Sequence, residues 1–339
     1  MKAFYIKEPG QTAIEDLQQP RPGPQDLLLQ TRLIGLCGTD LSTFRGKNPL
    51  VSYPRIPGHE IAATVVEVGN DVPAGFEPGM NVTVYPNSHC GKCASCRRGR
   101  TNACKFNETL GVQRDGAMKG FFIAPWQKVY RADKLSLREL SLVEPLSIGF
   151  HGVERGRVSA TDTVGVIGCG MVGLGAIAGA SARSATVIAI DLDDEKLALA
   201  KNVGAHHTIN SRTGSVHEEL QAITGGLGPD VMIEAVGVPN TYCMAVEEVA
   251  HTGRVVYIGW AIEPVCYQSK LFVHKELDIL GSRNSLTEFP AVIEMLSERA
   301  FPVEATISRT VPFSEAGGAL RHWSESPQSF TKILVEMDT

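Results

Sequence analysis

The sequence lacks a strong charge of either sign. Its 339 residues carry 32 Lys and Arg against 37 Asp and Glu, a formal net charge of −5 at pH 7. A broad basic surface for nucleic acid or an anionic membrane is therefore not expected, and a small molecule is the expected partner. Internal repeats, low-complexity segments and a disordered tail are not apparent either. A globular chain of this length usually forms two domains.

The sequence also lacks a long apolar run free of glycine. Its first residues, MKAFYIKEPGQ, have no apolar core of the secretory type, so we expect a cytoplasmic protein without structural disulfides. The run at 164–181 is uncharged and reaches the length of a membrane-spanning helix. Six of its residues are glycines, grouped towards its start. This pattern favours a buried strand, a glycine turn and a helix over a membrane span.

Cysteines are few, but half of them are crowded together. Of eight in the chain, Cys90, Cys93, Cys96 and Cys104 have the spacing Cys-x2-Cys-x2-Cys-x7-Cys. In a reducing compartment such a cluster indicates metal or redox chemistry. Four thiolates close a tetrahedral zinc shell and leave no position for water, as in structural zinc sites. An iron–sulfur cluster uses the same four ligands and remains an alternative at this point.

A second set of possible metal ligands is spread along the sequence. LCGTD at 36–40 contains Cys37, PGHE at 57–60 contains His59 and Glu60, and VEPLS at 143–147 contains Glu144. Each residue alone is more commonly a packed or hydrogen-bonded core residue. Together they supply a thiolate, an imidazole and two carboxylates, and a catalytic zinc needs about three protein ligands with one position left open.

Residues 162–191 carry the pattern of a dinucleotide site. The apolar run VGVI is followed by GCGMVG at 168–173, which contributes Gly168, Gly170, Val172 and Gly173, and the strand TVIAI ends at Asp191. The glycines allow a tight turn, close approach of a pyrophosphate and close helix–strand packing. A carboxylate at Asp191 accepts from both ribose hydroxyls and repels a 2′-phosphate, so NAD is expected over NADP. The alternative for Asp191 is an N-cap of the helix that follows it.

Further strands are predicted within 230–237, 253–260 and 274–284, with helical stretches between them. Alternation of strand and helix predicts a parallel, doubly wound sheet, and ligands bind at the carboxyl ends of its strands. Val236, Gly237, Ile258 and Gly259 are therefore candidates for the wall of a nicotinamide site. The first half of the chain instead has short β-rich pieces, such as 63–72 and 79–86, that suit an irregular β-barrel.

The order of these motifs resembles that of the zinc-containing medium-chain alcohol dehydrogenases, in particular their sorbitol and threonine dehydrogenase branch. The resemblance covers essentially the whole chain. It implies an α/β protein with a GroES-like irregular β-barrel catalytic domain at 1–148 and 292–339 and an NAD-binding Rossmann domain at 149–291. It also implies a homodimer or homotetramer, usually formed through edge strands of the Rossmann sheets.

The same resemblance implies roles for the metal ligands. Cys90, Cys93, Cys96 and Cys104 match the structural zinc lobe. Cys37 and His59 match two ligands of the catalytic zinc, and Glu60 and Glu144 match the two acidic positions. In the family one of these glutamates ligates zinc directly, while the other acts through water or exchanges with it; the resemblance leaves open which does so in this chain.

The implied reaction is hydride transfer between an alcohol and NAD, with zinc stabilising the alkoxide. Thr39 matches the hydroxyl that relays the proton in this family. Threonine dehydrogenases often have a histidine where this chain has Ser42, which lowers the expectation of threonine and leaves Asp40, Ser42 and Glu60 as further relay candidates.

The expected substrate is a polyol, a sugar acid or a sugar phosphate. Arg283 and Asn284 lie in GSRN, which is similar to a stretch in bacterial sugar-acid dehydrogenases of the L-galactonate 5-dehydrogenase type, and a guanidinium there is suited to a carboxylate or phosphate. Arg45 and Asn48 are further candidates for substrate hydroxyls. The alternatives are L-threonine, a simple secondary alcohol, or a relative that kept the fold and lost the chemistry.

Overall fold

The computed structural model describes residues 1–337, which fall into two compact units. The first unit contains Met1–Glu144, Phe289–Arg299 and the chain from Val303 onward, and the second contains Pro145–Glu288 and Ala300–Pro302. Helix α3, Leu137–Arg155, contains the boundary between Glu144 and Pro145. The boundaries expected from the sequence, after residues 148 and 291, fall a few residues further along the chain.

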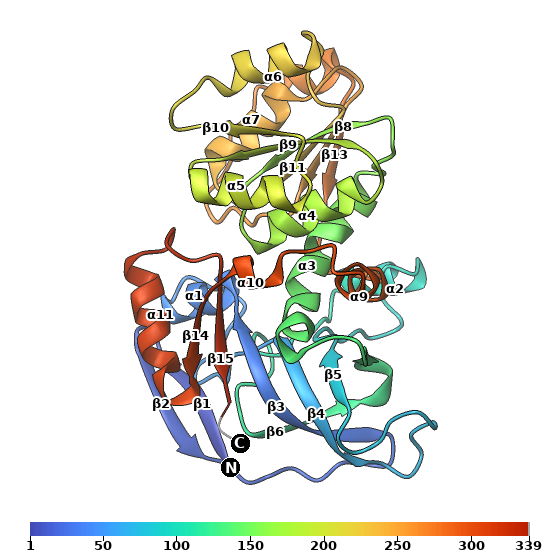
Figure 1. The fold of residues 1–339 in the computed structure, drawn as a ribbon, viewed down its shortest axis with the longest axis vertical. Helices are drawn as coiled ribbons and strands as arrows, with labels where there is room; N and C mark the ends of the chain where they lie inside the picture. Colours follow the sequence, from blue (N-terminus) through green and yellow to red (C-terminus); the bar gives the residue numbers. More distant parts are fainter. Residues whose placement is uncertain (338–339) are drawn as a thin grey trace. The chain divides into compact units, whose positions relative to one another are not determined.

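The first unit is built on β-strands (Figure 1). Its main sheet has seven strands; six follow the order β14-β15-β3-β4-β5-β7, and β6 pairs with β3. A separate antiparallel pair is formed by β1 and β2. The bounds are β1 Lys2–Glu8, β2 Gln11–Asp16, β3 Asp26–Leu36, β4 Glu60–Val68, β5 Asn81–Val84, β6 Phe121–Pro125, β7 Val129–Arg131, β14 Ile307–Pro312 and β15 Lys332–Glu336.

Strand β3 is the centre of this sheet. Its sequence DLLLQTRLIGL is mostly apolar and mostly buried. β4 pairs along one edge of the strand, while β6 and β15 share the other. Register shifts between Leu28 and Leu29 and between Thr31 and Leu33 bend the pairing with β4. The irregular barrel expected from the sequence is therefore confirmed.

Short helices complete the first unit. They include α1, which follows β3, and α11, which lies between β14 and β15 in the sequence. Phe4, Ile34 and Phe313 belong to its apolar core. The bounds are α1 Gly38–Phe44, α2 Ala94–Arg97, α9 Phe289–Ser297, α10 Val303–Thr306 and α11 Ala316–Glu325, with 3-10 turns η1 Thr101–Ala103, η2 Trp126–Lys128 and η3 Phe313–Glu315.

The second unit is a doubly wound α/β fold (Figure 1). Its six parallel strands have the order β10-β9-β8-β11-β12-β13, so successive strands are added on one side of β8 up to β10 and on the other side from β11 onward. The carboxyl ends of the strands at such a change of side form the usual ligand crevice. The bounds are β8 Thr163–Ile167, α4 Met171–Ser181, β9 Thr186–Asp191, α5 Asp194–Val203, β10 His207–Asn210, α6 Val216–Thr224, β11 Val231–Glu234, α7 Pro239–Glu248, β12 Arg254–Tyr257, α8 Lys270–His274 and β13 Asp278–Gly281.

The expected strands in this unit are confirmed, but they are shorter than predicted. β11 ends at Glu234, because the chain turns at Gly237 with φ +86°. The uncharged run at 164–181 forms most of β8, the glycine turn and α4, as predicted. Among residues 1–337 no helix combines the length and the apolar character that a bilayer span requires.

The glycine turn places three glycines in three different environments. Gly168 has φ +94°, which is favourable for glycine and costly for other residues. A Cβ on Gly173 would overlap the carbonyl oxygen of Gly168, so this glycine permits the helix to pack on the strand. A Cβ on Gly170 would meet no atom within 4 Å, and Gly170 has φ −71°. There is thus free space beside the backbone at Gly170, whereas the backbone at Gly173 is packed against Gly168.

We expect Gly173→Ala to destabilise the second unit by about 1–3 kcal/mol, the usual cost of overpacking a filled interior. Gly170→Ala, two positions after the first glycine of the same turn, serves as the control and should cost at most about 1 kcal/mol, because Gly170 is the N-cap of α4, where alanine is only moderately less favourable than glycine. Thermal unfolding of the two variants checks this. Equal midpoints for both would contradict the packing role given to Gly173.

Candidate functional site

The four clustered cysteines converge in the first unit. Cys90, Cys93, Cys96 and Cys104 have sulfur atoms that all lie within 4.8 Å of one another. Gly91 and Gly99, with φ +72° and +74°, let the loop wrap around this point. All cysteines in the described part of the chain are free thiols, so the cluster is not a disulfide pair.

Backbone N–H groups point at these sulfurs. Cys90 N donates to Cys104 Sγ at 3.3 Å, Cys93 N to Cys90 Sγ at 3.4 Å, and Phe106 N to Cys104 Sγ at 3.3 Å. Hydrogen bonds from the Ser95 hydroxyl and from backbone N–H groups lower the pKa of Cys93 to about 5. Donors of this kind stabilise thiolates, which are the ligand form of cysteine. The loop therefore fits a cation held by four sulfurs.

The second set of ligands begins at the N-terminus of α1. Cys37 is the N-cap residue, and its sulfur accepts from Thr39 N at 3.5 Å. The carboxylate of Asp40 reaches back to Cys37 N at 2.9 Å, which completes a capping box. The thiol is thus fixed at the positive end of a short helix, and Thr39 lies half-buried in its first turn.

Cys37, His59 and Glu60 come together in the interior of the first unit. One ligand atom from each lies within 4.8 Å of the other two. His59 is 4% exposed, and Glu60, the first residue of β4, is fully buried. Glu144 on α3 is also buried but lies outside this group of three. Burial raises the pKa of Glu144 to about 7, with the charge of His59 lowering it and that of Glu60 raising it.

Asp40 faces the histidine. Its Oδ1 lies 3.9 Å from His59 Nδ1, both atoms are buried, and neither has a hydrogen-bond partner within residues 1–337. Burial raises the pKa of Asp40, while His59 lowers it. Burial lowers the pKa of His59, but Asp40 and Cys37 outweigh it and hold that pKa well above the usual value. A positive charge is therefore favoured at this point, and a thiolate, an imidazole and a carboxylate are ligands that zinc accepts.

Glu60 has a partner that the sequence analysis missed. Lys332 Nζ, at the start of β15, lies 2.5 and 2.7 Å from the two carboxylate oxygens of Glu60 and donates to Leu36 O at 3.0 Å. Lys332 is only 4% exposed. Gly35 makes room, because a Cβ there would overlap Glu60 Oε2. A lysine that opens the apolar strand KILVE was the available signal, since a buried lysine needs an acidic partner.

Other first-unit candidates have structural contacts. Arg45 donates to the hydroxyl of Ser324 at 3.0 Å, which links α1 to α11. Asn48 donates to the Thr43 hydroxyl at 3.1 Å and accepts from Leu50 N at 3.1 Å. These contacts occupy both side chains within the fold, so we do not carry either forward as a substrate contact.

The predicted cofactor residues lie at the carboxyl ends of strands in the second unit. Asp191, the last residue of β9, accepts from Cys169 N with Oδ2 at 2.7 Å and from Leu192 N with Oδ1 at 2.7 Å. The N-cap of α5 is Asp193, which accepts from Glu195 N and Lys196 N. The alternative that Asp191 caps α5 is therefore wrong. The carboxylate of Asp191 is hydrogen-bonded to the glycine turn through Cys169 N.

The remaining candidates follow β11, β12 and β13. Val236 is about half exposed, and Gly168, Gly170, Val172 and Gly173 surround the start of α4. Ile258 and Gly259 directly follow β12. Arg283 and Asn284 follow β13 in the second unit, where Asn284 has φ +51°, whereas the possible zinc ligands lie in the first unit.

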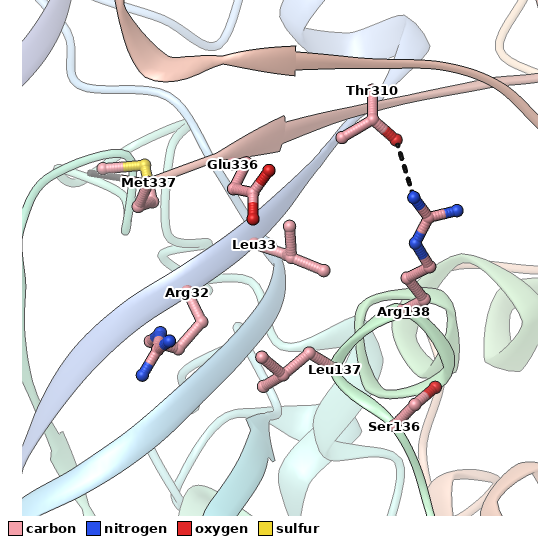
Figure 2. A pocket seen from close by; sticks show the side chains of 8 residues that line it. All are labelled: Arg32, Leu33, Ser136, Leu137, Arg138, Thr310, Glu336 and Met337. Carbon is pink, nitrogen blue, oxygen red and sulfur yellow. Dashed lines mark hydrogen bonds between the residues drawn. The ribbon is translucent and has the colours of Figure 1, made fainter. Parts of the chain in front are cut away.

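Figure 2 shows a pocket of about 300 Å³ in the first unit. Arg138 reaches across it to the Thr310 hydroxyl at 3.5 Å and also pairs with Glu304 at 2.7 Å. None of the predicted site residues lines it, so we assign it no function. Its lining consists of Arg32, Leu33, Ser136, Leu137, Arg138, Thr310, Glu336 and Met337.

Comparisons with known proteins define the class. Residues 23–134 match the alcohol dehydrogenase GroES-like domain, and residues 171–298 match the zinc-binding dehydrogenase family. The protein is therefore an oxidoreductase of the zinc-binding dehydrogenase class. It belongs to the zinc-type medium-chain alcohol dehydrogenases, in their sorbitol and polyol branch.

Three relatives illustrate the branch. A sorbitol dehydrogenase of Bacillus subtilis is 30% identical over 99% of this chain and 97% of its own. The L-galactonate-5-dehydrogenase of Escherichia coli is 29% identical over 93% of this chain and 92% of its own. An L-threonine 3-dehydrogenase of Pyrococcus horikoshii is 34% identical over 83% of this chain and 82% of its own.

Two solved structures share the whole fold. A zinc-binding dehydrogenase of Sinorhizobium meliloti bound to NADP has a TM-score of 0.90 and 30% identity, with 99% of this chain and 98% of that chain covered. An alcohol dehydrogenase (rspB) of E. coli CFT073 complexed with NADH has a TM-score of 0.91 and 29% identity, with 99% of each chain covered. Both structures hold a nicotinamide cofactor.

We expect Lys332→Met to lower stability by about 3–5 kcal/mol, because it leaves Glu60 buried without its counter-charge. Adding Glu60→Gln should recover much of this loss, since no unpaired charge remains. Lys2→Met is the control: Lys2 also forms an ion pair, with Asp16 at 2.9 Å, but the two side chains are 60% and 79% exposed. Thermal unfolding compares the variants, and a Lys332→Met protein as stable as Lys2→Met would contradict the assignment.

Proposed function

We propose that this protein oxidises a secondary alcohol of a polyol, sugar acid or sugar phosphate with NAD, or runs the reverse reduction. The observation that carries the proposal is the cluster of the half-buried Cys37 with the buried His59 and Glu60, in a chain of the zinc-type alcohol dehydrogenase family. The relatives named sorbitol dehydrogenase and L-galactonate-5-dehydrogenase support this substrate class.

In this proposal Cys37, His59 and Glu60 hold a catalytic zinc, with Glu144 beside them, and Cys90, Cys93, Cys96 and Cys104 hold a structural zinc. When bound, the catalytic zinc makes the alcohol more acidic and NAD accepts the hydride. Asp40 faces His59 Nδ1 at 3.9 Å and supplies a negative charge beside the ring, and Lys332 keeps the carboxylate of Glu60 in place.

The proton must leave a buried site through side chains of this chain. Thr39 is suited to this step, because it lies in the first turn of α1 two residues after Cys37 and is half-buried. Ser42, also half-buried on α1, is the next hydroxyl along that helix. We propose that Thr39 accepts the alcohol proton and that Ser42 and water carry it further.

The cofactor would bind at the carboxyl ends of β8, β9, β11 and β12. The open backbone at Gly170 and the N-terminus of α4 suit a pyrophosphate. The carboxylate of Asp191 suits ribose hydroxyls, and the following Leu192 offers no positive charge to a 2′-phosphate. We therefore propose NAD for this chain, although the Sinorhizobium relative is bound to NADP. Val236 and Ile258 would face the nicotinamide.

We propose Arg283 and Asn284 as substrate contacts, with the guanidinium pairing with a carboxylate or phosphate. L-Threonine is the second candidate substrate, because the Pyrococcus relative of that activity is 34% identical. Ser42, in place of the histidine often found in threonine dehydrogenases, supports the first candidate over the second.

We also propose a homodimer or homotetramer in the cytoplasm. β13 is an edge strand of its sheet, and Ile279 on it is 40% exposed while the nearby Val273 is 85% exposed. An apolar, unpaired edge is well suited to a second copy of the same strand. A monomeric mass by light scattering would exclude this arrangement.

The proposed reaction is tested by NADH formation across polyols, aldonic acids, sugar phosphates and L-threonine, with and without a zinc chelator. We expect one strong signal from the polyol, sugar-acid or sugar-phosphate group, lost on chelation because the alcohol is no longer activated. The same panel with NADP should be at least about tenfold weaker, because Asp191 repels the 2′-phosphate. Turnover of threonine alone would establish the second candidate in its place.

Two cysteine variants separate the two metal sites. Cys37→Ser should reduce turnover by more than about a thousandfold while leaving NADH binding intact, because only the alcohol site loses a ligand. Cys93→Ser should mainly lower the unfolding temperature, because a structural zinc contributes folding free energy. Zinc content by mass spectrometry should fall in both. Undiminished turnover in Cys37→Ser would exclude this residue as a catalytic ligand.

A further inference from the structure

Glu234 is a fully buried carboxylate that the proposed reaction does not use. It is the last residue of β11, so it lies at the carboxyl edge of the parallel sheet, next to β8. A leucine would fill such a place without the cost of burying a charge. The presence of a carboxylate at this position therefore needs an explanation, which its contacts supply.

One carboxylate oxygen of Glu234 organises the loop that follows β11. Oε1 accepts from Val236 N at 2.8 Å, from Gly237 N at 2.7 Å and from the Thr241 hydroxyl at 2.8 Å. The next helix, α7, has no side-chain cap of its own, because its N-cap residue is Val238. Glu234 thus fixes both the loop and the start of the helix.

The main chain of Glu234 fixes the loop after β12. Its carbonyl oxygen accepts from Ile258 N at 2.9 Å and from Gly259 N at 3.1 Å. The two loops touch each other, since a Cβ on Gly237 would lie 2.8 Å from Trp260 N. The hydroxyl of Tyr242, on α7, also donates to Gly259 O. A single residue therefore links both loops that are candidates for the nicotinamide wall.

The second carboxylate oxygen lies against the loop after β12. Oε2 is buried and has no hydrogen-bond partner among the described residues, and a Cβ on Gly259 would lie 2.5 Å from it. On the other side, Val236 packs on the glycine turn, because a Cβ on Gly168 would lie 2.6 Å from Val236 Cγ2. A shift of the Glu234 side chain would therefore move Val236 relative to the turn expected to hold the pyrophosphate.

We infer that Glu234 is a positioning residue for the nicotinamide half of the cofactor: its carboxylate, by accepting three hydrogen bonds, fixes the loop that carries Val236 against the loop that begins at Ile258, whose N–H the main-chain carbonyl of Glu234 holds. The inference rests on the proposed use of NAD. The adenosine half depends on other groups, Asp191 and the glycine turn, so the two halves of the cofactor are separable by experiment.

The test compares NADH with ADP-ribose, which lacks the nicotinamide, by titration calorimetry on the full-length protein. Glu234→Ala should weaken NADH binding about tenfold or more and change ADP-ribose binding less than about twofold, because three buried hydrogen bonds are lost near the ring only. Glu234→Gln keeps an acceptor oxygen and should restore most of the NADH affinity. ADP-ribose binding also verifies that the second unit is folded.

Thr241→Val is the milder variant, because it removes one of the three donors, and it should weaken NADH binding about two- to fivefold. Glu247→Ala changes an exposed carboxylate on the same helix α7 and is the matched control without effect. Equal losses for NADH and ADP-ribose in Glu234→Ala, or no loss for either, would overturn the inference. Wild-type protein that binds neither molecule would overturn the proposed use of NAD, and this inference with it.

Discussion

Balancing charge in the interior of the first unit is the constraint on which its site depends. Asp40, Glu60 and Glu144 bury three carboxylates near the thiol of Cys37. Lys332 supplies positive charge, Asp40 and Cys37 hold the pKa of His59 well above its usual value, and burial raises the pKa of both Asp40 and Glu144, which favours their neutral forms. A divalent cation held by Cys37, His59 and Glu60, as we propose, would add positive charge next to these carboxylates. Both the spacing of Cys37, His59 and Glu60 and the excess of carboxylates around them are therefore compatible with a bound cation.

The sheet of the first unit explains how these charges are held. β3 pairs with β4, which begins at Glu60, and with β15, which begins at Lys332. Leu36, at the end of β3, leads directly into Cys37 and α1, and its carbonyl oxygen accepts from Lys332. Three adjacent strand ends thus bring the possible metal ligands Cys37 and Glu60 and the counter-charge of Lys332 close together. A change in strand register would separate Glu60 from Lys332 by moving side chains to the opposite face.

The sequence predicted the parts of the structure that local spacing determines. The glycine turn, its flanking strand and helix and the four-cysteine loop are each encoded within a short segment, and each was found. Lys332 was missed because its partner Glu60 is 272 positions away, and only the pairing of β15 with β3 joins them. Asp40 was considered as a proton relay, but its contact with His59 depends on how α1 meets the start of β4. The ends of β11 and β12 were placed too late, because Gly237 and Gly259 turn the chain for reasons of tertiary contact.

The two units differ in whether backbone groups or side chains form the proposed sites, and this difference explains which sites the sequence predicts. The second unit offers mainly backbone: N–H groups at the start of α4 and two loops held by Glu234. Backbone sites need glycines at fixed spacing, so they leave a readable motif. The first unit offers side chains whose charges must be balanced by residues distant in the sequence. Substrate choice likewise depends on a few side chains whose neighbours are set by the fold, so a local motif does not reveal it. Arg283 of the second unit is the side chain that we propose for this role, so the comparison of acidic with neutral substrates is the most informative arm of the substrate panel.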